Sequence, residues 1–155
     1  MQTNKQMKYP DQHKTHETSL DRTRQQEVLD VMAAALGEGI TFKMTNTGTT
    51  YDAMMYYNEH PAGIIEIKFR NTPAHMYPTY TIDAKKIDEL AAIAKRDNVY
   101  AYLIVSWQGD IRGLDIPESV KRGTMYPTKT QKRRDRDELA DLVYEIPMED
   151  FKKIA

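Results

Sequence analysis

The fold is decided by Tyr51-Asp52 and, one turn later, by Gly63-Ile64-Ile65-Glu66-Ile67-Lys68-Phe69. Asp52 lies in a β-type run from Tyr51 to Tyr57, and Glu66 and Lys68 lie two residues apart in the next run. Side chains alternate between the two faces of a strand, so Glu66 and Lys68 share one face. A carboxylate and an ammonium in a buried strand cost several kcal/mol unless they are paired or bind something. The stretch therefore predicts that two acids and a lysine converge.

This set of side chains suits metal-assisted hydrolysis of a phosphodiester. Carboxylate oxygens hold hard divalent cations, so we expect Asp52 and Glu66 to hold Mg²⁺ or Mn²⁺. A lysine beside them orients the attacking water and offsets the charge that builds on the phosphate, which is the role we expect for Lys68. The looser acid-x-Lys pattern also occurs at Asp83-Ala84-Lys85 and Asp150-Phe151-Lys152, but neither lies inside an apolar β-run.

The surrounding sequence predicts the element order α-β-β-β-α-β. Apolar residues at helical spacing indicate a first helix from about Asp21 to Leu36. Three β-runs with short turns follow, which favours an antiparallel meander: Ile40 to Thr45, Tyr51 to Tyr57, and Gly63 to Arg70. After a link rich in Pro and Tyr, Asp83 caps a second helix that runs to about Arg96. The strand Tyr100 to Trp107 is apolar throughout its centre, as expected for a strand covered on both faces.

The aspartate on one strand, the Glu66-Ile67-Lys68 motif on its hairpin partner and this element order together resemble the PD-(D/E)xK nuclease superfamily. Within it, the layout is most similar to archaeal Holliday-junction resolvases and small phage-encoded nucleases. The resemblance covers roughly residues 21 to 107. It implies an α/β fold with a restriction-endonuclease-like αβββαβ core, in which helices flank a mixed central sheet. It also implies a divalent-metal-dependent DNA endonuclease, with branched DNA such as Holliday junctions as one class of substrate.

The resemblance assigns further roles. It implies that the backbone carbonyl of Ile67 is a third metal ligand and that Glu27 is an additional acid near the metal, with Asp30 as an alternative on the same helix. Tyr51 stands in place of the proline that gives the family its name. Lys86 stands where many relatives have glutamine, and either reaches a phosphate of DNA or is an exposed helix lysine. Arg70, just beyond the motif, is expected to contact DNA.

Composition indicates a single domain in a reducing compartment. The chain has 155 residues, of which 40% are hydrophobic, and no cysteine, so disulfides and thiol chemistry are excluded. We expect a flexible arm over residues 1–18 and one nuclease-like domain over 19–155. Its core is 21–107 and its C-terminal extension is 108–155. With no apolar run of membrane-spanning length and no signal peptide, we expect a cytoplasmic protein, in the host cell if a phage encodes it.

The C-terminal extension contains a basic segment. The net charge is −1, yet residues 121–136 hold seven lysines and arginines against the single acid Asp135. The segment is predicted to be a loop, which either contacts DNA phosphates through Lys132, Arg133 and Arg134 or is solvated surface. Strands are expected at Ile111 to Ile116 and near Leu142 to Ile146, followed by a short helix from about Met148.

Two questions stay open from the sequence. A non-catalytic DNA-binding or protein-interaction module that retains this fold is the alternative to an enzyme, with Glu66 and Lys68 as a plain ion pair. Assembly is the second question, because a resolvase-like substrate would call for a homodimer. Apolar residues that look exposed either support such a dimer or pack inside the monomer: Met54, Met55, Tyr56, Tyr57, Val143, Tyr144 and Phe151.

Overall fold

The fold is known from a computed structural model, which describes residues 19–116, 124–127 and 142–155. The predicted arm 1–18 and most of the predicted basic loop lie outside these ranges. The helices are α2 (Ser19–Leu36) and α3 (Ala84–Asp97), with a short 3₁₀ helix at Met148–Asp150. The strands are β1 (Ile40–Met44), β2 (Ala53–Tyr57), β3 (His60–Arg70), β4 (Thr79–Asp83), β5 (Tyr100–Trp107), β6 (Asp110–Asp115), β7 (Thr124–Pro127), β8 (Leu142–Pro147) and β9 (Lys152–Lys153).

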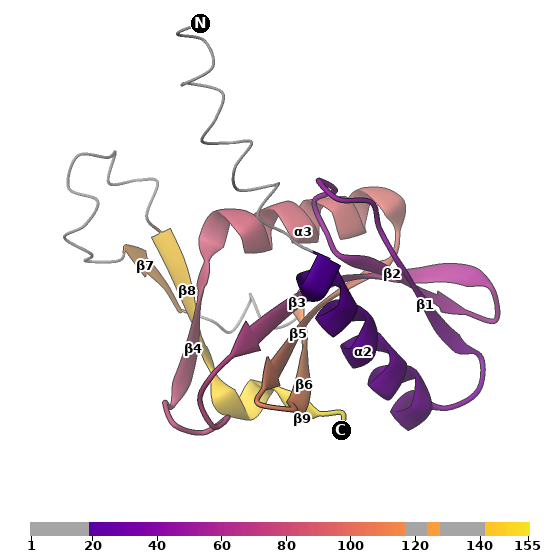
Figure 1. The fold of residues 1–155 in the computed structure, drawn as a ribbon. Coiled ribbons are helices and arrows are strands. Elements are labelled where there is room, and N and C mark those ends of the chain that lie inside the picture. The colour runs from indigo at the N-terminus through magenta and orange to yellow at the C-terminus, as the bar shows by residue number, and fades with distance from the viewer. Residues whose placement is uncertain (1–18, 117–123, 128–141) are drawn as a thin grey trace, which may run out of the picture.

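The strands form two sheets (Figure 1). The larger has the order β1-β2-β3-β5-β6-β9, and the smaller has the order β4-β8-β7. β1, β2 and β3 pair antiparallel, which confirms the predicted meander, whereas β3 and β5 pair in parallel. The central sheet is therefore mixed, and the predicted α/β fold class is confirmed.

The two faces of the central sheet are covered by different elements. Along β3, Ile64 belongs to the core shared with α3 and the smaller sheet, while Ile65 and Ile67 belong to the core shared with α2. β5 alternates in the same way, with Leu103 on the α3 side and Ile104 on the α2 side. Both faces of these two strands are thus buried, as the continuous apolar run predicted. Glu66, in phase with Ile64, faces the α3 side.

Several boundaries differ from the sequence prediction. β4 was not predicted, because the prolines near it obscure its pattern and its partner β8 lies far away in the chain. Thr124–Pro127 forms β7, so the prediction of a continuous loop over 121–136 is wrong at these residues, which pair with β8. The hairpin between β2 and β3 is tighter than predicted. Asn58 and Glu59 form its turn with φ of 49° and 70°, the left-handed backbone that suits two-residue hairpins.

The helix boundaries follow the sequence closely. Asp83 precedes α3 and its side chain accepts a hydrogen bond from the backbone N–H of Lys85, which confirms the predicted cap. Asn98 ends the same helix in the left-handed conformation. Among the described residues, neither helix is both long enough and apolar enough to cross a membrane.

Candidate active site

Asp52 is held in place by its own backbone and by its side chain. It lies immediately before β2, rather than inside the strand as predicted. Its N–H donates to the carbonyl of Ile65 at 2.8 Å, and its carbonyl accepts from the N–H of Thr45 at 2.9 Å. Its Oδ2 accepts a third hydrogen bond, from the N–H of Ile67 at 2.8 Å. The side chain of Asp52 is therefore hydrogen-bonded to the backbone of the central residue of the Glu66-Ile67-Lys68 motif.

Glu66 is the buried member of the group, with 5% of its surface exposed. Its Oε2 lies 3.6 Å from Nζ of Lys68, and its Oε1 lies 3.7 Å from Nζ of Lys86. These are ion pairs longer than a hydrogen bond, and within the described residues Oε1 has no hydrogen-bond partner. Lys86 also donates to the backbone carbonyl of Thr50, which ties α3 to the turn before Asp52.

The two carboxyl groups influence each other's charge. Burial raises the pKa of Asp52 above its ordinary value, against the hydrogen bond from Ile67 and the positive charges of Lys68, Lys86 and Arg22. Burial, and then the charge of Asp52, raises the pKa of Glu66 from 4.5 to about 7, although Lys86 and Lys68 oppose the shift. Two neighbouring acids whose pKa values are both raised form a site that a cation would stabilise.

The side chains present fit a hard divalent cation. Both acids supply oxygen donors, and the unpartnered buried Oε1 of Glu66 has ligand capacity to spare. Within the described ranges, no group of three acids or histidines is close enough to hold a metal ion, so a third protein ligand from these ranges would be a backbone carbonyl. The carbonyl of Ile67 stays a prediction for that position.

Glu27 and Asp30 lie away from this group. Both are exposed on α2, which covers the opposite face of the sheet from Glu66. Glu27 lines a hollow with Arg70 and Gln108, and Asp30 accepts a hydrogen bond from Gln26 at 2.9 Å. The structure thus brings Asp52, Glu66, Lys68 and Lys86 together, whereas Glu27 and Asp30 lie outside that group. The role of Glu27 as an additional acid stays a prediction.

Three further residues were not singled out from the sequence. Arg22 of α2 donates to the carbonyl of Thr45 at 3.0 Å, and its charge acts on Asp52. Gln25 is buried, and its Oε1 has no hydrogen-bond partner among the described residues. Its spacing from Val28 and Leu29 places it on the apolar face of α2, and a polar residue at such a position is the signal that was overlooked. Tyr80 is the third, as a buried aromatic of the unpredicted strand β4.

The predicted DNA contacts are distributed over different parts of the chain. Lys86 is half-buried and paired with Glu66, so it belongs to the centre of the site rather than to an exposed helix surface. Arg70 is exposed at the end of β3, and its guanidinium lies 4.9 Å from the centre of the Tyr80 ring. Lys132, Arg133 and Arg134 lie outside the described residues.

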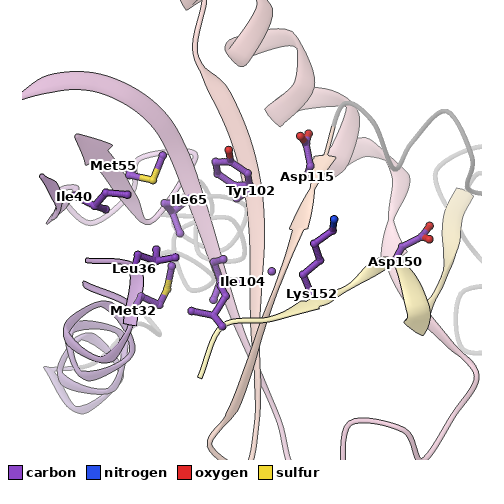
Figure 2. A pocket seen from close by; sticks show the side chains of 12 residues that line it. Met32, Leu36, Ile40, Met55, Ile65, Tyr102, Ile104, Asp115, Asp150 and Lys152 are labelled. Carbon is purple, nitrogen blue, oxygen red and sulfur yellow. The ribbon is translucent and has the colours of Figure 1, made fainter. Parts of the chain in front are cut away.

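A hollow lined mainly by apolar side chains lies elsewhere in the molecule (Figure 2). It has a volume of about 560 Å³ and lies on the α2 side of the sheet, where Met32, Met55 and Ile104 line it. Asp115, Asp150 and Lys152 lie along its other side in Figure 2. Asp52, Glu66 and Lys68 are absent from its lining, so the hollow is a different feature from the candidate active site.

Comparison with known proteins bears on the fold and the family of this chain. The family model described as "Phage putative PDDEXK endonuclease" matches residues 11–154. No curated protein matches the chain. Among solved structures, the chain is similar to Hjc from Archaeoglobus fulgidus, a Holliday junction resolvase, with 14% identity and a TM-score of 0.52 over 81% of this chain and 82% of that one. A fusellovirus nuclease also matches, with 16% identity and a TM-score of 0.45 over 94% of this chain and 84% of that one.

Proposed function

This chain belongs to the phage PDDEXK endonuclease family, and we propose from that premise that it is a divalent-metal-dependent DNA endonuclease. The observation that carries the proposal is the buried Glu66, whose pKa is raised by burial and then by Asp52, and whose two oxygens each lie within 4 Å of a lysine ammonium, at 3.6 Å and 3.7 Å. A purely structural role would not call for two acids and two lysines at one buried place, because each desolvated charge costs stability.

Each residue has a role in this proposal. Asp52 and Glu66 would hold Mg²⁺ or Mn²⁺, with the carbonyl of Ile67 as a further oxygen. The bound ion would polarise the phosphate and make water a better nucleophile. Lys68 is partly exposed, with 39% of its side chain accessible, so its ammonium is available to orient water and to offset phosphate charge. Lys86 favours the ionised form of Glu66, which is the form that binds a cation.

We propose branched DNA as the substrate. The resemblance of the fold to the A. fulgidus resolvase supports the idea, but the same fold serves other substrates, so the site has to be tested directly. The experiment is a cleavage panel of supercoiled, linear, single-stranded and four-way-junction DNA with Mg²⁺ and with Mn²⁺. We expect metal-dependent cleavage with the junction cut fastest. Faster cleavage of linear duplex than of the junction would contradict the proposal that branched DNA is the substrate. No cleavage of any DNA would contradict the proposal that the protein is an endonuclease.

A non-catalytic module with the same fold is the second candidate, in which Glu66 and Lys68, 3.6 Å apart, form a plain ion pair. Titration with Mn²⁺ separates the two. Binding that disappears in Asp52→Ala supports the catalytic site, whereas no binding at millimolar metal supports the inert module.

We also propose a homodimer. Two strands of a junction are related by a near two-fold axis, and a two-fold dimer presents two active sites in that arrangement. Tyr144 and Phe151, which looked exposed from sequence, are buried in the monomer core, so they do not form the interface.

A further inference from the structure

A second hollow lies beside the candidate active site, at the end of β3. Its volume is about 440 Å³, within the range of pockets that hold small ligands. Its lining comes from β3, the following link, the smaller sheet and Trp107: Arg70, Thr72, Ala74, Tyr77, Pro78, Thr79, Tyr80, Thr81, Trp107, Glu145 and Met148. None of these residues is a proposed ligand of the metal.

The position of the hollow relates it to the active site. Arg70 lies four residues beyond Glu66 on the same strand and in the same phase as Glu66 and Lys68, so all three point to one side of the sheet. Four residues of a strand span about 13 Å. Suppose that a phosphate of a DNA strand lies at Glu66 and that the strand runs along β3. In a B-form strand, the nucleotide at Arg70 is then about four base steps away, and in an extended strand it is fewer steps away.

The lining has the chemistry of a nucleobase site. Tyr77 is 62% exposed at the rim, where its ring is free to stack on a base. The floor is rigid, because Tyr80 and Trp107 are buried and pack edge to face with their ring centres 5.8 Å apart. The hydroxyl of Tyr80 is buried without a hydrogen-bond partner among the described residues.

The carboxylate in the wall of the hollow favours a nucleobase over a phosphate as the ligand. Glu145 of β8 lines it and is half-buried, and its Oε1 accepts a hydrogen bond from the hydroxyl of Thr79 at 3.2 Å. A carboxylate in the wall repels a phosphate but accepts hydrogen bonds from the amino group of a base, as acidic side chains do with cytosine. Arg70 at the mouth has the opposite charge, which suits the phosphate attached to that base.

We propose that this hollow receives one unpaired nucleobase of the substrate strand, near the phosphate that is cut, and that it prefers a base with an amino group, such as cytosine, over thymine. The inference rests on the proposed function, because it places a DNA strand along β3. A paired base is excluded, since its amino group and its stacking faces are already engaged within the duplex.

Binding without cleavage tests the inference. The affinity of the full chain is measured in metal-free buffer for single-stranded oligodeoxycytidylate and oligothymidylate of equal length, and for a duplex of each with its complement. We expect the cytosine strand to bind about tenfold more tightly than the thymine strand, and we expect no such preference between the duplexes.

Two variants connect the preference to the hollow. Tyr77→Ala is expected to weaken binding of both single strands about tenfold, because it removes the stacking ring. Glu145→Gln is expected to abolish the preference for cytosine, because an amide accepts from the amino group of cytosine and also donates to the O4 oxygen of thymine, which the carboxylate cannot do. Tyr100→Ala is the matched control, since Tyr100 is 59% exposed and does not line the hollow.

Equal affinity for the two single strands, or a preference that survives in Glu145→Gln, would overturn the inference. If the wild-type chain still cleaves DNA with Mg²⁺ or Mn²⁺, the proposed function stands after such a result. A chain that neither binds nor cleaves any DNA would overturn the proposed function and this inference together.

Discussion

At the scale of single residues, the main feature is a carboxyl group that folding makes unfavourable to ionise. Glu66 is 5% exposed and its pKa is about 7, mainly because of burial and secondarily because of Asp52. Lys68 and Lys86 lie close but not close enough for hydrogen bonds to its oxygens. Ionised Glu66 therefore lowers the stability of the folded state, as is common where side chains are arranged for binding or catalysis.

This feature predicts how stability depends on pH when metal is absent. The pKa of Glu66 rises from 4.5 in the unfolded chain to about 7 in the folded one, so between these values the folded state keeps a proton that the unfolded state has lost. The free energy of unfolding therefore decreases as pH rises through this window, by an amount on the order of 3 kcal/mol. Glu66→Gln should remove most of this decrease, so that the variant matches the wild type near pH 4.5 and exceeds it near pH 8.

Denaturant unfolding in chelator across this pH range measures the effect. Glu89→Gln, at an exposed position of α3, is the control and should leave the profile unchanged. A Glu66→Gln variant that is less stable than the wild type at pH 8 would contradict this description of the buried acid.

At the scale of elements, α3 contributes to the site through Lys86. Asp83 begins the helix, and the side chain of Lys86 in its first turn reaches both Glu66 and the carbonyl of Thr50. The helix thus supplies a positive charge to an acid on a strand of the central sheet. This contact depends on the packing of α3 against the α3-side core, where Ile87 and Leu90 are fully buried.

Replacing Lys86 should shift the pH dependence of cleavage. Its charge lowers the pKa of Glu66, so Lys86→Met should raise that pKa and move the acidic limb of the kcat/KM profile to higher pH. Lys85→Met is the matched control, because Lys85 is the exposed neighbour on the same helix. An unchanged acidic limb in Lys86→Met would show that Glu66 does not control the profile.

The sequence predicted the parts of the fold that depend on local pattern. Alternation along β3, the apolar run of β5 and the cap at Asp83 each reflect nearby residues, and the structure has all three. β4 and β7 instead form by pairing with β8, and the partners of β4 lie far along the chain, as with Thr79 and Pro147. Such a partner leaves little trace in the local sequence.

In the candidate site too, the sequence predicted what depends on local pattern and missed what depends on contacts between distant elements. Asp52, Glu66 and Lys68 were found because a charged pair inside an apolar strand is itself a signal. The pairing of Lys86 with Glu66 depends on how far α3 lies from β3, and no spacing in the sequence gives that distance. Glu27 was selected by resemblance, but the face of α2 that packs on the sheet carries Gln25, Val28, Leu29 and Met32 instead.

At the scale of the whole molecule, the charge is unevenly distributed. The chain has a net charge of −1, so general attraction to DNA is weak, and affinity has to come from local basic groups. Arg70 is one such group beside the site. The basic segment 121–136 is a second candidate, through its residues Lys132 to Arg134.

Replacing Lys132, Arg133 and Arg134 by alanine should weaken binding to all DNA sequences alike. Each phosphate contact that is lost should reduce the slope of log affinity against log salt by about 0.9. Affinity is measured across a range of salt concentrations, with Lys95→Ala on α3 as a control for the loss of a surface charge. A slope equal to that of the wild type would show that the segment is solvated surface.

Assembly is the second property at this scale. If a homodimer forms over the apolar hollow of Figure 2, Leu36→Glu should produce a monomer, because Leu36 lines the hollow and is 43% exposed. Leu20→Glu is the matched control on the same helix, at a residue that is 66% exposed and outside the hollow. Light scattering over a hundredfold range of concentration measures the mass. A wild-type chain that is monomeric throughout would remove the dimer and leave the nuclease assignment standing.

The most direct test of the central claim is cleavage by variants that still bind DNA. Wild type, Asp52→Asn and Lys68→Ala are compared on the substrate selected by the panel, with Mg²⁺, at protein concentrations that give equal bound fractions in chelator. Asp52 and Lys68 act on the metal and the transition state, while affinity comes mainly from phosphate contacts elsewhere. We expect both variants to bind DNA like the wild type and their cleavage to be nearly abolished. Cleavage at the wild-type rate by either variant would contradict the central claim.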